Sequence, residues 1–177
     1  MNATALAVAD KGFYRSATRV AILSVVAPAA YELWWLWQFV KFTRREGFPR
    51  ARAFWWYLVP IYGWIVLNRQ LDELKTRYGQ VTGTTFNASL AIGLFIASEV
   101  ASRFITRTSS ATNDLAVTIV GGLLLGGSAY MIQGAANAIQ AQQFGEEGLR
   151  GMSVGEVIAT LVGLVLLAFD ILAALPS

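Results

Sequence analysis

The sequence contains no cysteine and no histidine among its 177 residues. These absences exclude disulfide bonds, iron–sulfur clusters, thiolate zinc sites and imidazole ligation of haem. They also exclude Ser-His and Cys-His catalysis, which needs one of these side chains as a base or nucleophile. A cation site built from carboxylates or backbone carbonyl oxygens is still compatible with the sequence. We nevertheless expect a protein that is not an enzyme and that carries no cofactor and no bound metal.

Charged residues are scarce, at 14% of the chain, whereas a soluble domain has about a quarter. The deficit falls in long uncharged runs, and the mean hydropathy is +0.50. Such runs are typical of several membrane-spanning helices and not of one large buried core. The net charge of +3 is the excess of Lys and Arg expected beside a bilayer, and we predict no nucleic-acid partner.

Four hydrophobic runs predict membrane-spanning helices, over about residues 20–40, 86–105, 115–140 and 157–175. Each is close to the ~20 residues that cross roughly 30 Å of hydrocarbon, and Pro28 should kink the first. A fifth run, 53–68, is shorter and contains Pro60. It predicts a short tilted span, a re-entrant hairpin or a helix in the interface. The expected fold is an all-α polytopic membrane helix bundle, one domain over residues 1–177.

The orientation of this bundle depends on the run 53–68. If it spans, Lys and Arg are divided about equally between the two sides, and the positive-inside rule gives no orientation. If it dips and returns, the whole stretch from Lys41 to Arg77 lies on one side, which should then be cytoplasmic. In both cases the loop 41–52 is the best cytoplasmic candidate.

Small residues recur one helical turn apart in the last three hydrophobic runs. Helices in lipid gain little from burying apolar faces against each other, so close approach at small residues matters more. The residues in question are Gly93, Ala97, Gly122, Gly126, Ala159 and Gly163. These stripes predict a tight unit of the three C-terminal helices within one chain, and a face for self-association is the alternative.

Four charged residues fall within the predicted spans, where ionised groups are costly and often functional; one of them, Asp170, is close enough to the end of its span to lie at the interface. Glu32 lies midway along the first span, so it must be protonated, face protein or contact water. Glu99 and Arg103 are one turn apart near the end of another span. Their spacing predicts an ion pair within the helix, near the membrane interface.

Gln133, Asn137 and Gln140 form one polar face in the third run. Amides in membrane helices usually form hydrogen bonds to neighbouring helices, which is the first interpretation of this face. The alternative is a polar cavity that these amides line together with Glu32.

All six tryptophans lie between residues 34 and 64, on both sides of a basic loop. Aromatic rings beside Lys and Arg are typical of an anchor at the membrane interface. The same composition fits an anionic lipid headgroup or the transmembrane helix of a partner. The candidate contact residues in this aromatic–basic region, residues 31–64, are Trp34, Trp35, Trp37, Arg44, Arg45, Arg52, Trp55, Trp56 and Trp64.

The segments Ala30-Tyr31-Glu32-Leu33-Trp34-Trp35 and Pro49-x-x-Arg52-Ala53-Phe54, followed later by Asn137, carry a resemblance. The chain resembles a family of small uncharacterised prokaryotic membrane proteins, with Ala30 where the family often has glycine and Trp34 where it often has tyrosine. The resemblance covers about the first 70 residues. It implies a multi-pass protein of four or five spans in a prokaryotic cytoplasmic membrane, and it supplies no activity.

Two functions are compatible with these features. The first is a non-catalytic accessory or scaffolding subunit that contacts lipid or the helices of another membrane protein through the aromatic–basic region. The second is a homo-oligomeric channel or small-solute carrier that uses Glu32 and the face formed by Gln133, Asn137 and Gln140.

Overall fold

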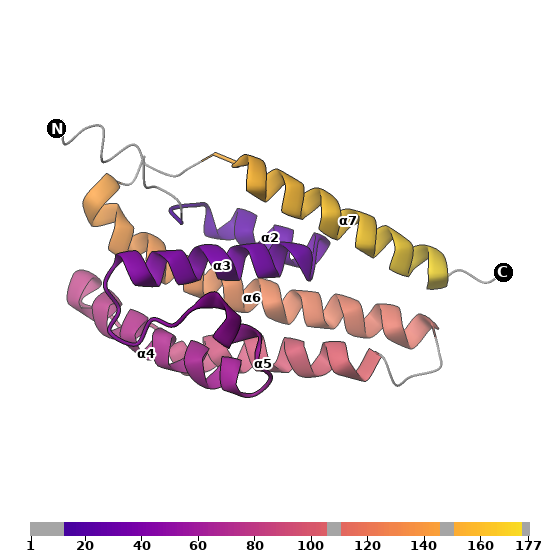
Figure 1. Ribbon diagram of the computed structural model, residues 1–177, viewed down its shortest axis with the longest axis horizontal. Helices are drawn as coiled ribbons and strands as arrows, with labels where there is room; N and C mark the ends of the chain where they lie inside the picture. Colours follow the sequence, from indigo (N-terminus) through magenta and orange to yellow (C-terminus); the bar gives the residue numbers. More distant parts are fainter. Residues whose placement is uncertain (1–12, 106–110, 146–150, 175–177) are drawn as a thin grey trace.

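The computed structural model describes residues 13–105, 111–145 and 151–174, and Figure 1 shows them as a bundle of helices. The described part contains six α-helices, one 3-10 helix and no β-strand. The α-helices are α2 (Ala17–Val26), α3 (Ala30–Arg45), α4 (Tyr62–Thr82), α5 (Ala88–Ile105), α6 (Ala111–Phe144) and α7 (Val154–Ala174), and the 3-10 helix is η1 (Phe54–Leu58). The predicted all-α helix bundle is confirmed.

The hydrophobic run 20–40 forms two antiparallel helices and not one kinked span. The chain turns at Pro28, which has no N–H to continue α2, and Ala29 takes a positive φ of 59°. Helix α3 then returns along α2, so that Phe13 stacks on Phe42 with ring centroids 5.2 Å apart. Both ends of this first hairpin, α2 and α3, lie at the same end of the bundle (Figure 1). The prediction of a single span over 20–40 is therefore wrong.

An aromatic cluster closes the open end of the first hairpin. Phe13 is 1% exposed, and its ring centroid lies 6.1 Å from that of Trp35 and 5.7 Å from that of Phe39. Phe42 extends the cluster to Phe48 in the following loop, at 5.8 Å. Such tilted and edge contacts suit the ring quadrupole, and they hold the segment before α2 against α3.

The short run 53–68 contains a second turn. After η1, Pro60 is followed by Ile61, whose φ is 65°, and α4 begins at the next residue. A glycine is required at position 63, because a Cβ there would overlap the backbone carbonyl group of Tyr57. The structure thus breaks this run into a 3-10 turn and the start of a long helix.

Helix α4 carries the chain back toward the end of the bundle from which η1 came. Arg77 donates a hydrogen bond to the carbonyl oxygen of Gly47 at 3.3 Å, and its guanidinium lies 4.0 Å from the carboxylate of Glu46. Residues 46 and 77, on either side of η1, therefore meet. The second hairpin, η1 and α4, folds back as the first one does.

Helices α5 and α6 pack directly, and Ser128 on α6 donates a hydrogen bond to the carbonyl oxygen of Ala91 on α5. Helix α7 does not join them as closely as the glycine stripes predict: it packs mainly against α3, while α2 is inserted along α6 (Figure 1). A Cβ on Gly126 of α6 would lie 2.9 Å from the carbonyl oxygen of Ala21 in α2. The prediction of one tight unit of three C-terminal helices is corrected by this inserted helix.

The other small residues fall into two groups. Gly122 and Gly163 contact the first hairpin, at Val25 and Ala27 respectively, and Ala159 is 8% exposed. Gly93 and Ala97 lie on an exposed face of α5, and the space around Gly93 is open. These last two make no close contact among the described residues.

One helical stretch among the described residues, Ala116–Gln142 of α6, is long and apolar enough to cross a membrane. The apolar stretches of α2 and α7 are shorter, at Ala17–Val26 and Val154–Phe169. Helix α5 is 18 residues long and is not among the candidate spans. The four clear spans predicted from the sequence are thus reduced to one.

Replacement of Gly126 by Leu should lower the thermal stability of the protein in detergent. The new side chain would overlap Ala21 and Val25 of α2, and overpacking of this kind costs about 1–3 kcal/mol. Gly93→Leu is the matched control, because nothing lies within 4 Å of a Cβ at that position. Equal melting temperatures for the two variants would contradict the packing of α2 against α6.

Candidate functional site

The tryptophans of the aromatic–basic region divide into an inner and an outer group. Trp35 is 1% exposed and donates a hydrogen bond from Nε1 to Oε1 of Gln133 at 3.1 Å. Trp34 and Trp64 are partly buried and pack against the core. These three residues therefore contribute to the bundle itself and do not form a free contact surface.

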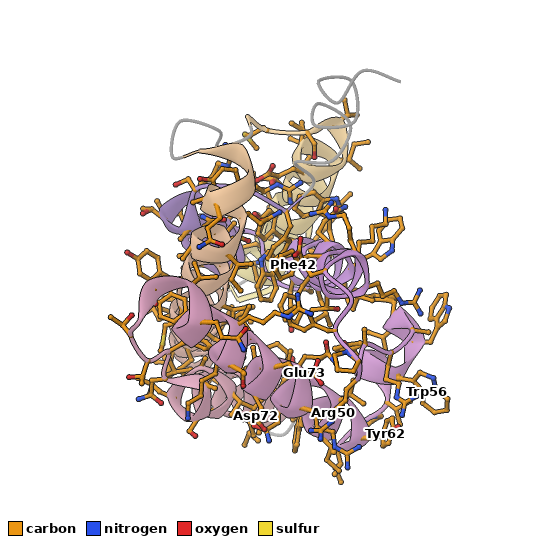
Figure 2. All side chains as sticks on the ribbon, turned by 90° about the vertical axis from the view of Figure 1, so that its left-hand side faces the viewer. Phe42, Arg50, Trp56, Tyr62, Asp72 and Glu73 are labelled. Atoms are coloured by element: carbon orange, nitrogen blue, oxygen red, sulfur yellow. The ribbon has the colours of Figure 1, made fainter. Side chains whose placement is uncertain are left out.

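The outer group forms what we term the aromatic–basic surface: Trp37, Lys41, Arg44, Arg45, Arg52, Trp55 and Trp56, all exposed. Trp55 is 73% exposed, and the ammonium group of Lys41 lies 4.0 Å from the ring centroid of Trp37. Figure 2 shows Trp56 projecting outward beside Tyr62. Exposed indole rings on α3 and η1 are costly in water, so this surface is suited to an apolar or interfacial environment.

The amide face of α6 holds the segment before α2. Gln133 donates hydrogen bonds to the carbonyl oxygen of Phe13 and, at 2.9 Å, to Oδ1 of Asn137. Asn137 donates in turn to the carbonyl oxygen of Arg15. Gln140 is fully buried, and its amide has no hydrogen-bond partner among the described residues. The structure thus brings Gln133 and Asn137 to residues 13–15, and not to a cavity shared with Glu32.

Glu156 at the start of α7 is the centre of a buried ionic cluster. Its carboxylate oxygens lie 3.6 Å from Nε of Arg15 and 3.2 Å from Nε of Arg19, and Tyr31 donates a hydrogen bond to it at 3.3 Å. Glu156 and Tyr31 are 0% exposed, and Arg15 is 1% exposed. The guanidinium of Arg15 also lies 4.3 Å from the ring centroid of Trp34. This cluster joins the first hairpin to α7.

The sequence analysis missed this cluster, although a local signal for it exists. Ser153 and Glu156 have the spacing of a helix capping box. The structure forms that box, with Glu156 N donating to Ser153 Oγ at 3.2 Å and Ser153 N donating to Glu156 Oε2 at 3.4 Å. The motif predicts where α7 begins, but it does not predict which arginines pair with Glu156.

Glu32 and Glu99, both half-buried, lie beside the turns of the two hairpins. Their carboxyl groups are close enough to interact electrostatically. Both line a cavity of about 240 Å³ together with Arg103, and the turn residues Ala29 and Pro60 line it too. The structure therefore brings Glu32 to Glu99, which the sequence analysis did not foresee, and it retains Arg103 beside them.

A second inner cavity, of about 290 Å³, shares Ala29, Glu32 and Glu99 with the first. It continues between α5 and α6 to Ser102 and Thr118. The two inner cavities thus meet at the carboxyl pair and extend from it along different helices.

A larger, more open outer cavity of about 530 Å³ lies where the loop after α3 meets α4 and α6. Glu46, Glu73, Arg77, Gln80 and Gln142 supply polar groups to its wall. Glu73 also lies 3.7 Å from the guanidinium of Arg50, and Figure 2 shows these two residues on the same side of the molecule. The outer cavity is therefore polar and of mixed charge.

Among the described residues, no group of three or more carboxylate side chains is arranged to hold a metal ion. The cavities offer two carboxylates at most in close contact, which does not provide the six to eight oxygen ligands of a calcium site. Comparison of the chain with protein-family models, with curated proteins and with solved structures finds no match.

We expect Glu156→Gln to lower the free energy of unfolding by about 3 kcal/mol, because removal of one partner leaves buried arginine charge without a carboxylate. Glu73→Gln is the control, since its partner Arg50 is 63% exposed and such pairs contribute about 0–1 kcal/mol. Denaturant unfolding of the purified protein in detergent measures both. A loss for Glu73→Gln as large as that for Glu156→Gln would contradict the central role of the ionic cluster.

Proposed function

We propose that the chain is a non-catalytic, multi-pass integral membrane protein that binds anionic phospholipid through its aromatic–basic surface. The observation that carries this proposal is the exposure of Trp37, Trp55 and Trp56 among the four exposed basic side chains of this surface. Indole rings favour the depth of the lipid headgroups, and each Lys or Arg near an anionic leaflet contributes about 1 kcal/mol. The indole rings and the basic side chains of this surface are therefore both suited to the headgroup region of an anionic leaflet.

The exposed surface of α7 supports the location in a bilayer. Leu161, Val165, Phe169 and Leu172 are each more than half exposed, and the stretch Val157–Phe169 contains no charged residue. An apolar surface of this length is unfavourable in water, whereas lipid chains accommodate it. In this arrangement α5, α6 and α7 cross the bilayer, and the two hairpins enter it and return.

The two hairpins also support an orientation. Because each returns to the end from which it started, the basic stretch Lys41–Arg77 lies on one side. By the positive-inside rule that side is cytoplasmic. The aromatic–basic surface then faces the cytoplasmic leaflet, whose surface potential is negative. Anionic headgroups are accordingly the ligands to which this surface is complementary in charge.

The triple variant Arg44→Ala/Arg45→Ala/Arg52→Ala should bind phosphatidylglycerol or cardiolipin about 100-fold more weakly, because three contributions of about 1 kcal/mol are lost. Native mass spectrometry of the detergent-purified protein, titrated with each lipid, measures the affinity. Phosphatidylcholine should bind weakly to both proteins.

Arg50→Ala/Arg77→Ala is the matched control for this experiment. These arginines come from the same region, but Glu73 and Glu46 already neutralise them, so lipid affinity should change little. Equal losses in the two variants, or equal binding of anionic and neutral lipids, would contradict the proposal. A stoichiometric membrane protein that is lost on Trp55→Ala would assign the surface to a partner instead.

A further inference from the structure

Three side chains between η1 and α4 have buried polar atoms without a hydrogen-bond partner among the described residues. These atoms are the hydroxyl of Tyr57, both amide atoms of Gln70 and Oε2 of Glu73. Tyr57 is 8% exposed, and Gln70 is 0% exposed. Buried polar groups nearly always have a partner, so several unpartnered groups in one region indicate a polar ligand that the described chain does not supply.

The three side chains belong to one place in the fold. The backbone of Tyr57 packs against Gly63 at the start of α4, and its hydroxyl is close enough to Glu73 for the carboxylate charge to act on it. Tyr57 therefore extends along the face of α4 that carries Gly63, Gln70 and Glu73, which are separated by whole turns of the helix. Gln70 lies between the other two on this face.

The surroundings of the Tyr57 hydroxyl connect this place to the aromatic–basic surface. On the side of α3 and of the loop before η1, the hydroxyl lies beside Thr43, the backbone of Arg52 and the charge of Arg44. Arg44 and Arg52 belong to the surface for which a lipid phosphate is the proposed ligand. A headgroup whose phosphate lies at these two arginines would have its far end next to Tyr57.

The outer cavity provides an entrance to the site. Glu73 lines this cavity of about 530 Å³ together with Glu46 and Pro49. Glu46 directly follows Arg45 of the aromatic–basic surface, and Pro49 lies in the same loop as Arg52. The cavity volume is within the range of small-ligand sites. A small polar headgroup can therefore enter from the aromatic–basic surface and reach the carboxylate of Glu73.

The unpartnered atoms define the chemistry of that headgroup. A carboxylate only accepts hydrogen bonds, so Oε2 of Glu73 requires a donor, whereas the Tyr57 hydroxyl and the Gln70 amide both donate and accept. The hydroxyl groups of a polyol match all three. Arg44 and Arg52 together with Glu73 sum to one positive charge, which an anionic phosphodiester offsets. An ethanolamine headgroup also offers donors, but it has no net charge and would leave that positive charge unbalanced.

We propose that Glu73, Tyr57 and Gln70 form a site for the glycerol headgroup of an anionic phospholipid, whose phosphate is held by Arg44 and Arg52. The glycerol hydroxyls donate to Oε2 of Glu73 and exchange hydrogen bonds with the Tyr57 hydroxyl and the Gln70 amide. This inference rests on the proposed lipid binding and deepens it, because charge alone attracts every anionic lipid whereas this site selects among them.

The test is native mass spectrometry of the detergent-purified protein, titrated with phosphatidylglycerol, phosphatidylethanol and phosphatidic acid of the same acyl chains. Phosphatidylethanol has the same charge as phosphatidylglycerol but no headgroup hydroxyl, and phosphatidic acid has at least as much charge. Electrostatic attraction alone would give no preference for phosphatidylglycerol. We expect phosphatidylglycerol to bind about tenfold more tightly than the other two, the factor expected for a hydrogen bond to a charged group.

Tyr57→Phe and Glu73→Gln should each remove most of this preference and leave the binding of phosphatidylethanol unchanged. Both variants should fold, because the Tyr57 hydroxyl has no partner among the described residues and the partner of Glu73, Arg50, is 63% exposed. Tyr130→Phe and Asp72→Asn are the matched controls and should retain the full preference. Tyr130 is 51% exposed on α6, and Figure 2 shows Asp72 on the outer side of α4.

Two further ligands identify the source and the type of the headgroup. Soluble glycerol phosphate should bind at least about 100-fold more weakly than phosphatidylglycerol, because it has no acyl chains to bury. Equal affinity of this soluble compound would overturn the assignment to a lipid. Phosphatidylethanolamine that binds more tightly than phosphatidylglycerol would assign Glu73 to an ammonium group and overturn the glycerol site.

The outcomes separate this inference from the proposed function. Equal binding of phosphatidylglycerol and phosphatidylethanol, or a preference that persists in both Tyr57→Phe and Glu73→Gln, overturns the glycerol site, while anionic-lipid binding by the aromatic–basic surface stands. Failure of all three anionic lipids to bind contradicts the proposed function itself.

Discussion

The buried carboxylate of Glu156 is the contact on which the arrangement of helices depends. It receives two arginines from the start of the first hairpin and the hydroxyl of Tyr31 from its returning helix. Removing such charges from solvent is costly, and the cost is offset only when all partners are in place. The first hairpin therefore cannot shift along α7 without leaving charge unpaired, and its turn is held at a constant depth in the bundle.

The all-α fold could be predicted from the sequence because it depends on local signals. The apolar runs and the scarcity of charge indicate helices, and Pro28 and Pro60 mark the two places where helices end. The exposure of Trp55 and Trp56 also follows from composition, since a short aromatic segment cannot bury every ring. Each of these features is decided within one or two helical turns.

The hairpins could not be predicted, because a kinked span and a folded-back pair of helices have the same local sequence. The choice is made by contacts between distant residues, such as Phe13 on Phe42 and Gly126 on Ala21. The same holds for the site, where Glu32 is separated in sequence from Glu99 but adjacent in space. Gln133 bonds to Trp35 of the neighbouring helix α3, as the first interpretation of these amides expects. The bonds of Gln133 and Asn137 to residues 13–15 could not be predicted, because that segment lies before the first hydrophobic run.

The chemistry of the two turns bears on how the interior works. A turn that must move during a reaction cycle usually contains residues with free backbone torsions, whereas proline restricts φ and a side chain at positive φ tolerates few alternatives. Ile61 is β-branched, so its φ of 65° is one that few such residues adopt, and Gly63 sits directly against the backbone of Tyr57. The inner cavities are therefore preformed, with both turns as rigid walls.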